Sequence, residues 1–205
     1  MQEKVTKKLD QNDSEGYGSP LRDIEFGVSL ILKGFHKAFN IDLSDKNFRG
    51  TPRRVARAYM ELLSGHKEEN DITKVTEDEF PSSYDGMIVA SGIKCFSLCP
   101  HHLLPVEYIV NVGYIPSEKT VGISKLSRVV EILSKRLCLQ EVFTKDIVLY
   151  LGKHLKPKGV IVQVKGRHFC MVMRGIKKDS WTMTSSITGS FRNPAVRHEF
   201  QILCT

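Results

Sequence analysis

Residues 96–105 read Phe96-Ser97-Leu98-Cys99-Pro100-His101-His102-Leu103-Leu104-Pro105, and the rest of the chain is organised around them. This stretch places one thiol and two imidazoles next to one another, with apolar residues on both sides. Zinc favours such sulfur and nitrogen donors, and a catalytic zinc keeps three protein ligands and one open position. Cys99 with one histidine supplies only two ligands, so we expect a third elsewhere in the chain.

A second group of metal-binding side chains lies further along the chain, in Gly166-Arg167-His168-Phe169-Cys170-Met171-Val172-Met173-Arg174-Gly175. We interpret Gly166 as a turn between two strands of a hairpin. On an extended strand, residues two apart face the same side. His168, Cys170 and Arg174 would then face one space, and a metal ligand, an imidazole and a cation that share one pocket indicate an active site.

The two adjacent histidines have different expected roles. On extended backbone His101 and His102 cannot point the same way, so one would bind metal and the other would serve proton transfer or structure. Spacing alone therefore predicts Cys99, one of these histidines and Cys170 as zinc ligands. A site of this kind lowers the pKa of a bound water to about 7, and a nearby imidazole can shuttle protons. The natural reaction is hydrolytic attack on an electron-poor carbon.

Composition indicates a globular protein. The 205 residues fit one medium domain, or one domain with an N-terminal appendage, and 41% are hydrophobic while 26% are charged. No apolar run reaches the roughly 18 residues of a membrane span, and the N-terminus predicts no signal peptide. We therefore expect a cytoplasmic protein without a membrane partner. Five cysteines are an odd number, too few for a disulfide framework, so reduced thiols are expected.

The net charge of +7 has two explanations. Lysines scattered over the surface would promote solubility, or the charge would attract an anionic partner. A nucleic-acid surface needs a clustered basic stripe with interleaved aromatic residues, and the sequence has none. A small polyanion such as a nucleoside triphosphate fits equally well, so we expect no nucleic acid as partner.

The chain divides into a polar, flexible N-terminal arm (1–18), a helical segment (19–66) and a catalytic domain (67–205). Serine or threonine followed by proline predicts a helix start at Ser19-Pro20 and again at Thr51-Pro52. Residues 67–85 read as loop. Periodicity then predicts, in order, strands at 87–93 and 106–115, helices from 124 and through 143–151, strands around Val160–Val164 and His168 and at 181–187, and a helix at 194–203. Because strands and helices do not alternate strictly, the fold class is α+β with a mainly antiparallel sheet.

Two further groups suggest how a nucleotide would be held. Ser124-Lys125-Leu126-Ser127-Arg128 opens a predicted helix, and cations at a helix N-terminus form a phosphate site, to which Arg174 would add a charge. In Gln140-Glu141, the carboxylate could accept two hydrogen bonds from a guanine edge.

Taken together, these residues resemble the GTP cyclohydrolase I family over about residues 22–203. The resemblance is carried by five motifs in the family's order and by a matching C-terminal segment. They are Thr51-Pro52-Arg53-Arg54-Val55-Ala56, Cys99-Pro100-His101-His102, Val121-Gly122-Ile123-Ser124-Lys125-Leu126-Ser127-Arg128, Leu139-Gln140-Glu141, His168-Phe169-Cys170-Met171-Val172-Met173-Arg174-Gly175 and Arg197-His198-Glu199-Phe200.

The resemblance implies a tunnelling fold, in which a small antiparallel sheet with paired helices and an N-terminal helical extension assembles into a barrel-forming homo-oligomer. Members of the family form decamers of two pentamers with active sites at subunit interfaces. The implied activity is zinc-dependent: the imidazole ring of the guanine of GTP is hydrolysed, formate leaves, and rearrangement gives 7,8-dihydroneopterin triphosphate.

The resemblance also implies a role for each site residue. The metal ligands would be Cys99, His102 and Cys170, and the catalytic residues His101, His168 and Ser124. Lys125, Arg128 and Arg174 would hold the triphosphate with Arg54, which a neighbouring subunit could supply, and Glu141 with Gln140 would read the guanine.

The sequence departs from the family at two positions. The family usually has glutamate where this chain has Pro100, and it tends to have arginine where this chain has Val142. These departures leave an alternative open, a catalytically impaired homologue that acts as a GTP-binding or regulatory subunit. A third interpretation, a structural zinc module on nucleic acid, rests only on the positive charge.

Overall fold

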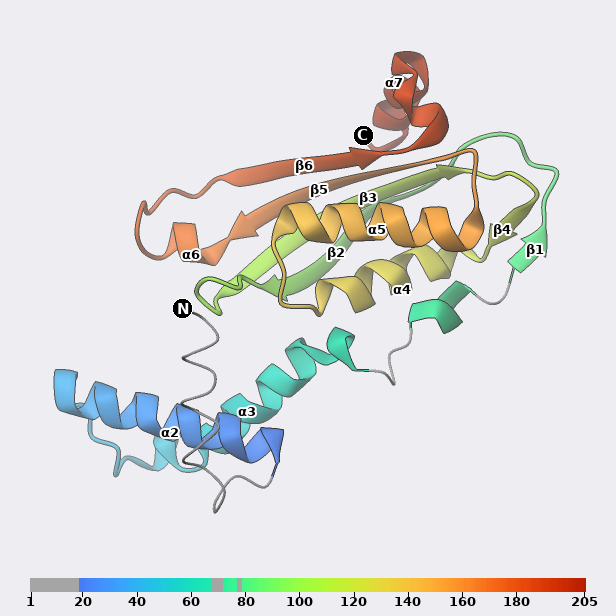
Figure 1. Ribbon diagram of the computed structural model, residues 1–205. Coiled ribbons are helices and arrows are strands. Elements are labelled where there is room, and N and C mark those ends of the chain that lie inside the picture. The colour runs from blue at the N-terminus through green and yellow to red at the C-terminus, as the bar shows by residue number, and fades with distance from the viewer. Residues whose placement is uncertain (1–18, 68–71, 77–78) are drawn as a thin grey trace, which may run out of the picture. The chain divides into compact units, whose positions relative to one another are not determined.

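A computed structural model describes residues 19–67, 72–76 and 79–205 (Figure 1). The chain divides into two compact units, one that ends at Glu61 and one that begins at Leu62. The predicted N-terminal arm, 1–18, lies outside the described residues. In the described part of the chain, no helix combines the length and the apolar character of a transmembrane span.

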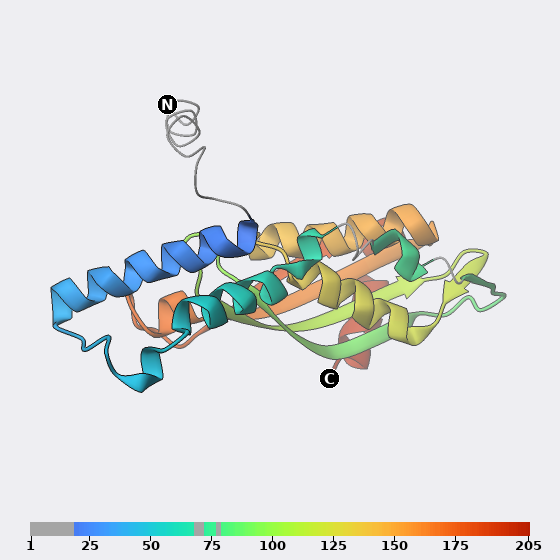
Figure 2. The ribbon, with the colours of Figure 1, turned by 90° about the horizontal axis from the view of Figure 1, so that it is seen from below.

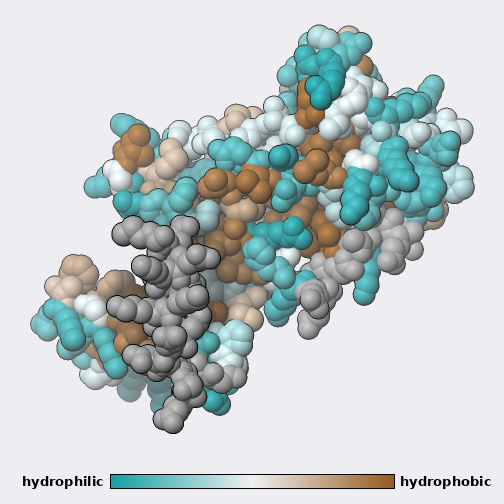
Figure 3. All heavy atoms as spheres, in the orientation of Figure 1, coloured by the Kyte–Doolittle hydropathy of each residue, from teal (hydrophilic) through white to brown (hydrophobic). Residues whose placement is uncertain are grey.

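The first unit is helical. Helix α2 (Pro20–Phe39) begins where predicted, and the side chain of Ser19 caps it by accepting a hydrogen bond from the backbone N–H of Arg22. A 3₁₀ turn, η1 (Lys46–Phe48), leads to α3 (Thr51–Leu62), which also has the predicted start. Helix α2 buries none of its residues within the chain, and Figure 3 shows apolar side chains on its surface as brown spheres.

The second unit is built on a four-stranded antiparallel sheet in the order β2-β3-β5-β6. The bounds are Ile88–Leu98 for β2, Pro105–Ile115 for β3, Gly159–His168 for β5 and Trp181–Ile187 for β6. Two short strands, β1 (Glu79–Pro81) and β4 (Lys119–Val121), pair separately. The 3₁₀ turns η2 (Ser64–His66) and η4 (Ile72–Thr76) precede them.

Helices α4 (Ile123–Ser134) and α5 (Gln140–Leu155) lie side by side across one face of this sheet (Figures 1 and 2). The strand predicted at 106–115 is confirmed as β3, and every second side chain along it faces these helices and is at most 1% exposed. The core that results contains Val106, Tyr108, Val110, Val112, Tyr114, Val160, Val162 and Val164 from the strands, with Leu126, Val129, Val130, Leu133, Phe143, Ile147, Val148 and Leu151 from the helices.

The opposite face carries a smaller core near the C-terminus. The 3₁₀ turn η5 (Gly189–Arg192) and helix α7 (Pro194–Leu203) bring Phe191 and Phe200 against Ile161 of β5. The predicted bounds of β6 and α7 agree with the structure. This second core packs near the start of β5, away from the β5 end that carries His168.

The structure corrects the predicted hairpin at Gly166. Strand β5 continues through this glycine to His168, and a helical turn, α6 (Phe169–Val172), follows it. His168 and Cys170 therefore do not lie on one strand as expected. The sheet has one strand fewer than predicted, because Val160–Val164 and His168 belong to the same strand. The loop predicted over 67–85 also contains β1 and η4.

Candidate active site

The candidate site begins at the loop that joins β2 to β3. Its backbone is closed by two hydrogen bonds, one from the Cys99 N–H to the Leu104 carbonyl (2.9 Å) and one from the Leu103 N–H to the Cys99 carbonyl (2.8 Å). Leu103 adopts a left-handed conformation, with φ of 53°. We call residues 99–104 the metal loop. Its closure turns His102 back toward Cys99.

Helical turn α6 brings Cys170 to this loop, because His168 at the end of β5 pairs with Val106 at the start of β3. The Sγ atoms of Cys170 and Cys99 are 3.8 Å apart, and Nδ1 of His102 is 3.6 Å from Sγ of Cys99. All three ligand atoms lie within 4.8 Å of one another. The three side chains could therefore hold one metal ion.

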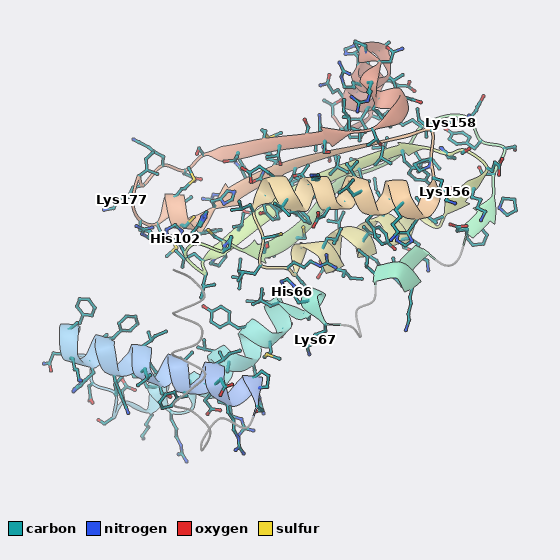
Figure 4. All side chains as sticks on the ribbon, in the orientation of Figure 1. His66, Lys67, His102, Lys156, Lys158 and Lys177 are labelled. Atoms are coloured by element: carbon teal, nitrogen blue, oxygen red, sulfur yellow. The ribbon has the colours of Figure 1, made fainter. Side chains whose placement is uncertain are left out.

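Burial of the two thiols suits a metal site that opens on one side. Cys99 is 5% and Cys170 8% exposed, whereas His102 is exposed (Figure 4). Burial is the main cause that raises the pKa of the Cys170 thiol, and the hydrogen bond to Cys99 raises it further. The positive charge of Arg174 acts in the opposite direction. A metal ion at this position would have to displace the thiol protons on binding.

His168 lies at the same end of the sheet and is half-buried. Its ring stands edge-on to the Tyr108 ring, with centroids 6.3 Å apart. Burial lowers the pKa of His168, and the negative charge of Glu141 partly offsets this effect. The imidazole is therefore mainly neutral near pH 7.

Gln140 contacts His168 directly. The amide oxygen Oε1 lies 2.8 Å from Nε2 of His168, and the Gln140 side chain is 3% exposed. Its amide nitrogen donates to the carbonyls of Val164 and Thr182. The sequence interpretation missed this contact, since nothing in the spacing of Gln140 and His168 signals it.

Three further predicted residues lie at this end of the unit. Glu141 is exposed at the start of α5, and Arg174 is exposed just beyond α6. His101 is exposed in the metal loop, with its ring centroid 6.1 Å from that of His102. The charge of Arg174 therefore acts on the Cys170 thiol, and that of Glu141 acts on His168.

The predicted phosphate-binding residues of α4 do not gather there. The carboxyl end of α4 is fixed near the metal loop, because Ser97 Oγ donates to the Arg136 carbonyl at 3.2 Å. A helix of 12 residues is about 18 Å long, so its amino end lies far along the sheet (Figure 1). Ser124 and Lys125 stand in this first turn, and Arg128 stands one turn further on.

Arg54, the last of the predicted site residues, belongs to the first unit. Its guanidinium donates to the carbonyls of Arg49 (2.7 Å) and Asn47 (3.1 Å) and to the Thr51 hydroxyl (2.9 Å). These bonds hold the side chain against its own segment.

An apolar cleft of about 320 Å³ borders the metal loop. It is lined by apolar residues that flank both ligand segments, among them Phe96, Leu98, Pro105, Phe169 and Met173. Phe96 is 57% and Met173 63% exposed within the single chain. Apolar surface therefore adjoins the thiol pair.

Comparisons with known proteins agree on one family. A family model described as GTP cyclohydrolase I matches residues 30–205. The GTP cyclohydrolase 1 of Synechococcus sp. (strain JA-2-3B'a(2-13)) is 40% identical over 175 residues, which cover 84% of this chain and 74% of the relative. That of Streptomyces griseus is 42% identical over 162 residues, covering 77% of this chain and 79% of the relative.

Among solved structures, the crystal structure of the archaeosine synthase QueF-Like in the apo form covers 51% of this chain and 95% of its own. It has a TM-score of 0.39 and 21% sequence identity. The family model includes every segment that forms the site, and the two relatives at 40% and 42% identity cover 84% and 77% of the chain. The chain belongs to the GTP cyclohydrolase I family.

Proposed function

We propose that this protein is a zinc-dependent GTP cyclohydrolase I. It would hydrolyse the imidazole ring of the guanine of GTP, release formate and rearrange the remainder to 7,8-dihydroneopterin triphosphate. Family membership supports the activity. The observation that carries the proposal is the meeting of two thiols and one imidazole from distant segments at an exposed end of the sheet.

The distances among the ligand atoms support zinc as the metal. Zinc with bonds of about 2.3 Å to sulfur and 2.0 Å to nitrogen in a tetrahedron would place two sulfurs roughly 3.8 Å apart, and a sulfur and a nitrogen roughly 3.5 Å apart. The corresponding separations are 3.8 Å for Cys99 and Cys170 and 3.6 Å for Cys99 and His102. Three ligands would leave the fourth corner open, as in catalytic zinc sites.

Each neighbouring residue has a role that suits its position. A bound zinc would supply Lewis-acid activation of water near neutral pH. His168 would donate a proton to the imidazole nitrogen of the guanine, and His101 would move protons during the later steps. Glu141 would accept hydrogen bonds from the guanine edge, and Arg174 would hold phosphate oxygens.

The proposal includes a homo-oligomer in which neighbouring chains complete each site. Ser124 and Lys125 lie in the first turn of α4, about 18 Å from the end fixed near the metal loop, and Arg128 lies one turn further along the helix. These three residues would therefore serve the site of a neighbouring subunit. Arg54 would likewise reach the site of a neighbouring subunit. Ser124 would assist the rearrangement of the sugar.

The edges of the sheet support the tunnelling fold and its closed barrel. In the described part of the chain, β2 and β6 each have one edge that pairs with no further strand. Copies of the chain that pair through these edges would satisfy their backbone groups and close a barrel. The exposed apolar residues of α2 and of the cleft would be covered in a decamer of two pentamers. We propose a cytoplasmic location, in keeping with five free thiols.

The test is to incubate zinc-loaded protein with GTP and to measure formate together with fluorescent pterin after oxidation. Release of both in equal amounts is the expected result. Absence of both would overturn the proposed activity.

The same assay tests the impaired homologue suggested by Pro100 and Val142, which predicts GTP binding without formate. The positions of Pro100 and Val142 favour an active enzyme over the impaired homologue. The backbone hydrogen bonds of the metal loop are donated by the N–H groups of Cys99, His102 and Leu103, so proline fits at position 100 without loss of a donor. Val142 is 44% exposed on α5 and is neither a ligand nor a hydrogen-bond partner of His168.

A further inference from the structure

The contact between Gln140 and His168 determines which nitrogen of the imidazole carries the proton. Nε2 of His168 lies 2.8 Å from Oε1 of Gln140. A neutral imidazole donates from one nitrogen and accepts at the other, so its tautomer follows from what each nitrogen meets. The orientation of the Gln140 amide therefore determines the tautomer of His168.

That orientation is fixed by backbone groups that can only accept. The Gln140 amide nitrogen lies 3.2 Å from the Val164 carbonyl and 3.0 Å from the Thr182 carbonyl. Turning the amide over would set its oxygen against two carbonyl oxygens in a buried site, which is strongly unfavourable. Oε1 must therefore face His168.

Two threonines complete the network in a consistent order. Thr144 donates its hydroxyl to the Gln140 backbone carbonyl at 2.7 Å. The Thr184 hydroxyl, 2.7 Å from that of Thr144, must then donate to it. The Thr184 oxygen, 3.1 Å from the Gln140 amide nitrogen, shares one of the two amide N–H groups with a carbonyl. Every buried polar group of the network is satisfied in this one arrangement.

Gly166 provides the space for this amide. A Cβ at position 166 would collide with Oε1 of Gln140 and would lie 2.9 Å from the ring of Tyr108. Tyr108 cannot withdraw, because it is 1% exposed and stacks on Phe143 with centroids 5.0 Å apart. The glycine is required because the Gln140 side chain crosses the strand at this point.

We propose that Gln140 is a positioning residue that holds His168 as the tautomer with hydrogen on Nε2. Nδ1 is then the nitrogen that exchanges a proton with the substrate. Nδ1 of His168 makes no hydrogen bond with any of the described residues. Gln140 then serves to orient His168 and does not read the guanine. In the reaction, which rests on the proposed function, Nδ1 first accepts a proton from the water that attacks the guanine carbon, so that an O–H bond breaks as the Nδ1–H bond forms. The Nδ1–H bond then breaks and the guanine nitrogen gains the proton, while the electron pair stays on Nδ1 and the ring remains protonated at Nε2.

The first test reads the tautomer without substrate. Zinc-loaded protein with ¹⁵N-labelled histidine is studied by solid-state NMR at pH 8, and the His168 signal is identified by its loss in His168→Asn. A protonated Nε2 and an unprotonated Nδ1 are expected, and the reverse pattern would overturn the proposal. Because no GTP is present, this result stands whether or not the protein releases formate.

The second test removes the amide. Gln140→Leu should mix the two His168 tautomers and lower kcat by about 10- to 100-fold, as changes to groups that orient an imidazole do, with less than about a threefold change in KM. A rise in KM with unchanged kcat would instead make Gln140 a guanine reader. Unchanged NMR signals would also refute the proposal. Gln201→Leu, at an exposed glutamine of α7, is the matched control.

Gly166→Ala provides a variant that keeps the Gln140 side chain intact. The added methyl group displaces the amide, so the same change in the His168 signals is expected. Gly166→Ala protein with wild-type signals would contradict the mechanism, even if Gln140→Leu fails to fold.

Discussion

The sulfur of Cys170 lies 3.8 Å from the sulfur of Cys99, although 71 residues separate them in the chain. The sheet register creates this proximity, since it sets the end of β5 beside the start of β3. Neither thiol is joined in a disulfide. The spacing and the buried setting suit a shared metal ion, and the first two predictions concern this pair.

Cys170→Ala should lose both the metal and the activity. Removing one of three ligands leaves a thiol and an imidazole, which cannot complete a zinc site. We expect a loss of activity beyond the roughly 10- to 100-fold that follows changes to groups behind the ligands. Metal content by mass spectrometry is the measurement, and Cys204→Ala is the control. A full equivalent of zinc retained in Cys170→Ala would refute the ligand set.

Removal of the metal should make the thiol pair sensitive to oxidation. A disulfide requires a sulfur separation of about 2.05 Å, which small side-chain rotations can reach from the present geometry. After chelation, a mild oxidant should join Cys99 to Cys170, and mass spectrometry of unreduced peptides should detect the link. Zinc-loaded protein should resist. Equal oxidation of both samples would indicate that the metal binds elsewhere.

Mixed oligomers should reveal that sites are shared between chains. Lys125→Ala and His168→Ala should each be inactive as pure proteins. The two variants are mixed in equal amounts, dissociated and allowed to reassociate at random. In a heterologous ring each site takes Lys125 from one chain and His168 from its neighbour, and each of these residues is intact half of the time. About one quarter of the sites should therefore have both residues intact. Formate release should recover in proportion to the number of these intact sites. Lack of recovery, with mixing verified by a mass tag, would place both residues in one chain's site.

Stability should decline at alkaline pH because of Cys95. Burial raises the pKa of this thiol to about 12, from an ordinary value of 9.0. Because the folded pKa exceeds the unfolded one, the contribution of Cys95 is fully present below pH 9 and is lost as pH rises toward 12. At pH 10.5 the loss is about 2 kcal/mol. Denaturant unfolding measures it, and Cys95→Ala should show a smaller decline between pH 8 and 10.5. An equal decline in both proteins would contradict the assignment.

Local patterns predicted most of the fold. The alternation of Val160, Val162 and Val164 and the start signals of α2 and α3 depend on neighbours in sequence, so they could be read directly. The need for glycine at position 166 could not be predicted in this way. It arises from the Gln140 side chain, which comes from another element and reaches the strand only after the sheet and helix have packed.

Donor chemistry alone makes Cys99 and Cys170 candidate ligands of one ion, and their geometry agrees with a metal site. The roles of the individual histidines, of Glu141 and of the phosphate-binding residues stay predictions. The displacement of Lys125 from the thiol pair had no signal in the sequence, because it depends on the direction in which α4 runs along the sheet.

The closed backbone of the metal loop has a consequence for how the ion is acquired. Hydrogen bonds between Cys99 and Leu104, and between Leu103 and Cys99, shape the loop through backbone groups alone. The donors are thus preorganised, unlike those of zinc fingers, which fold only around their ion. Exchange of the ion should therefore be reversible in the folded protein, and occupancy would follow the free zinc concentration around it.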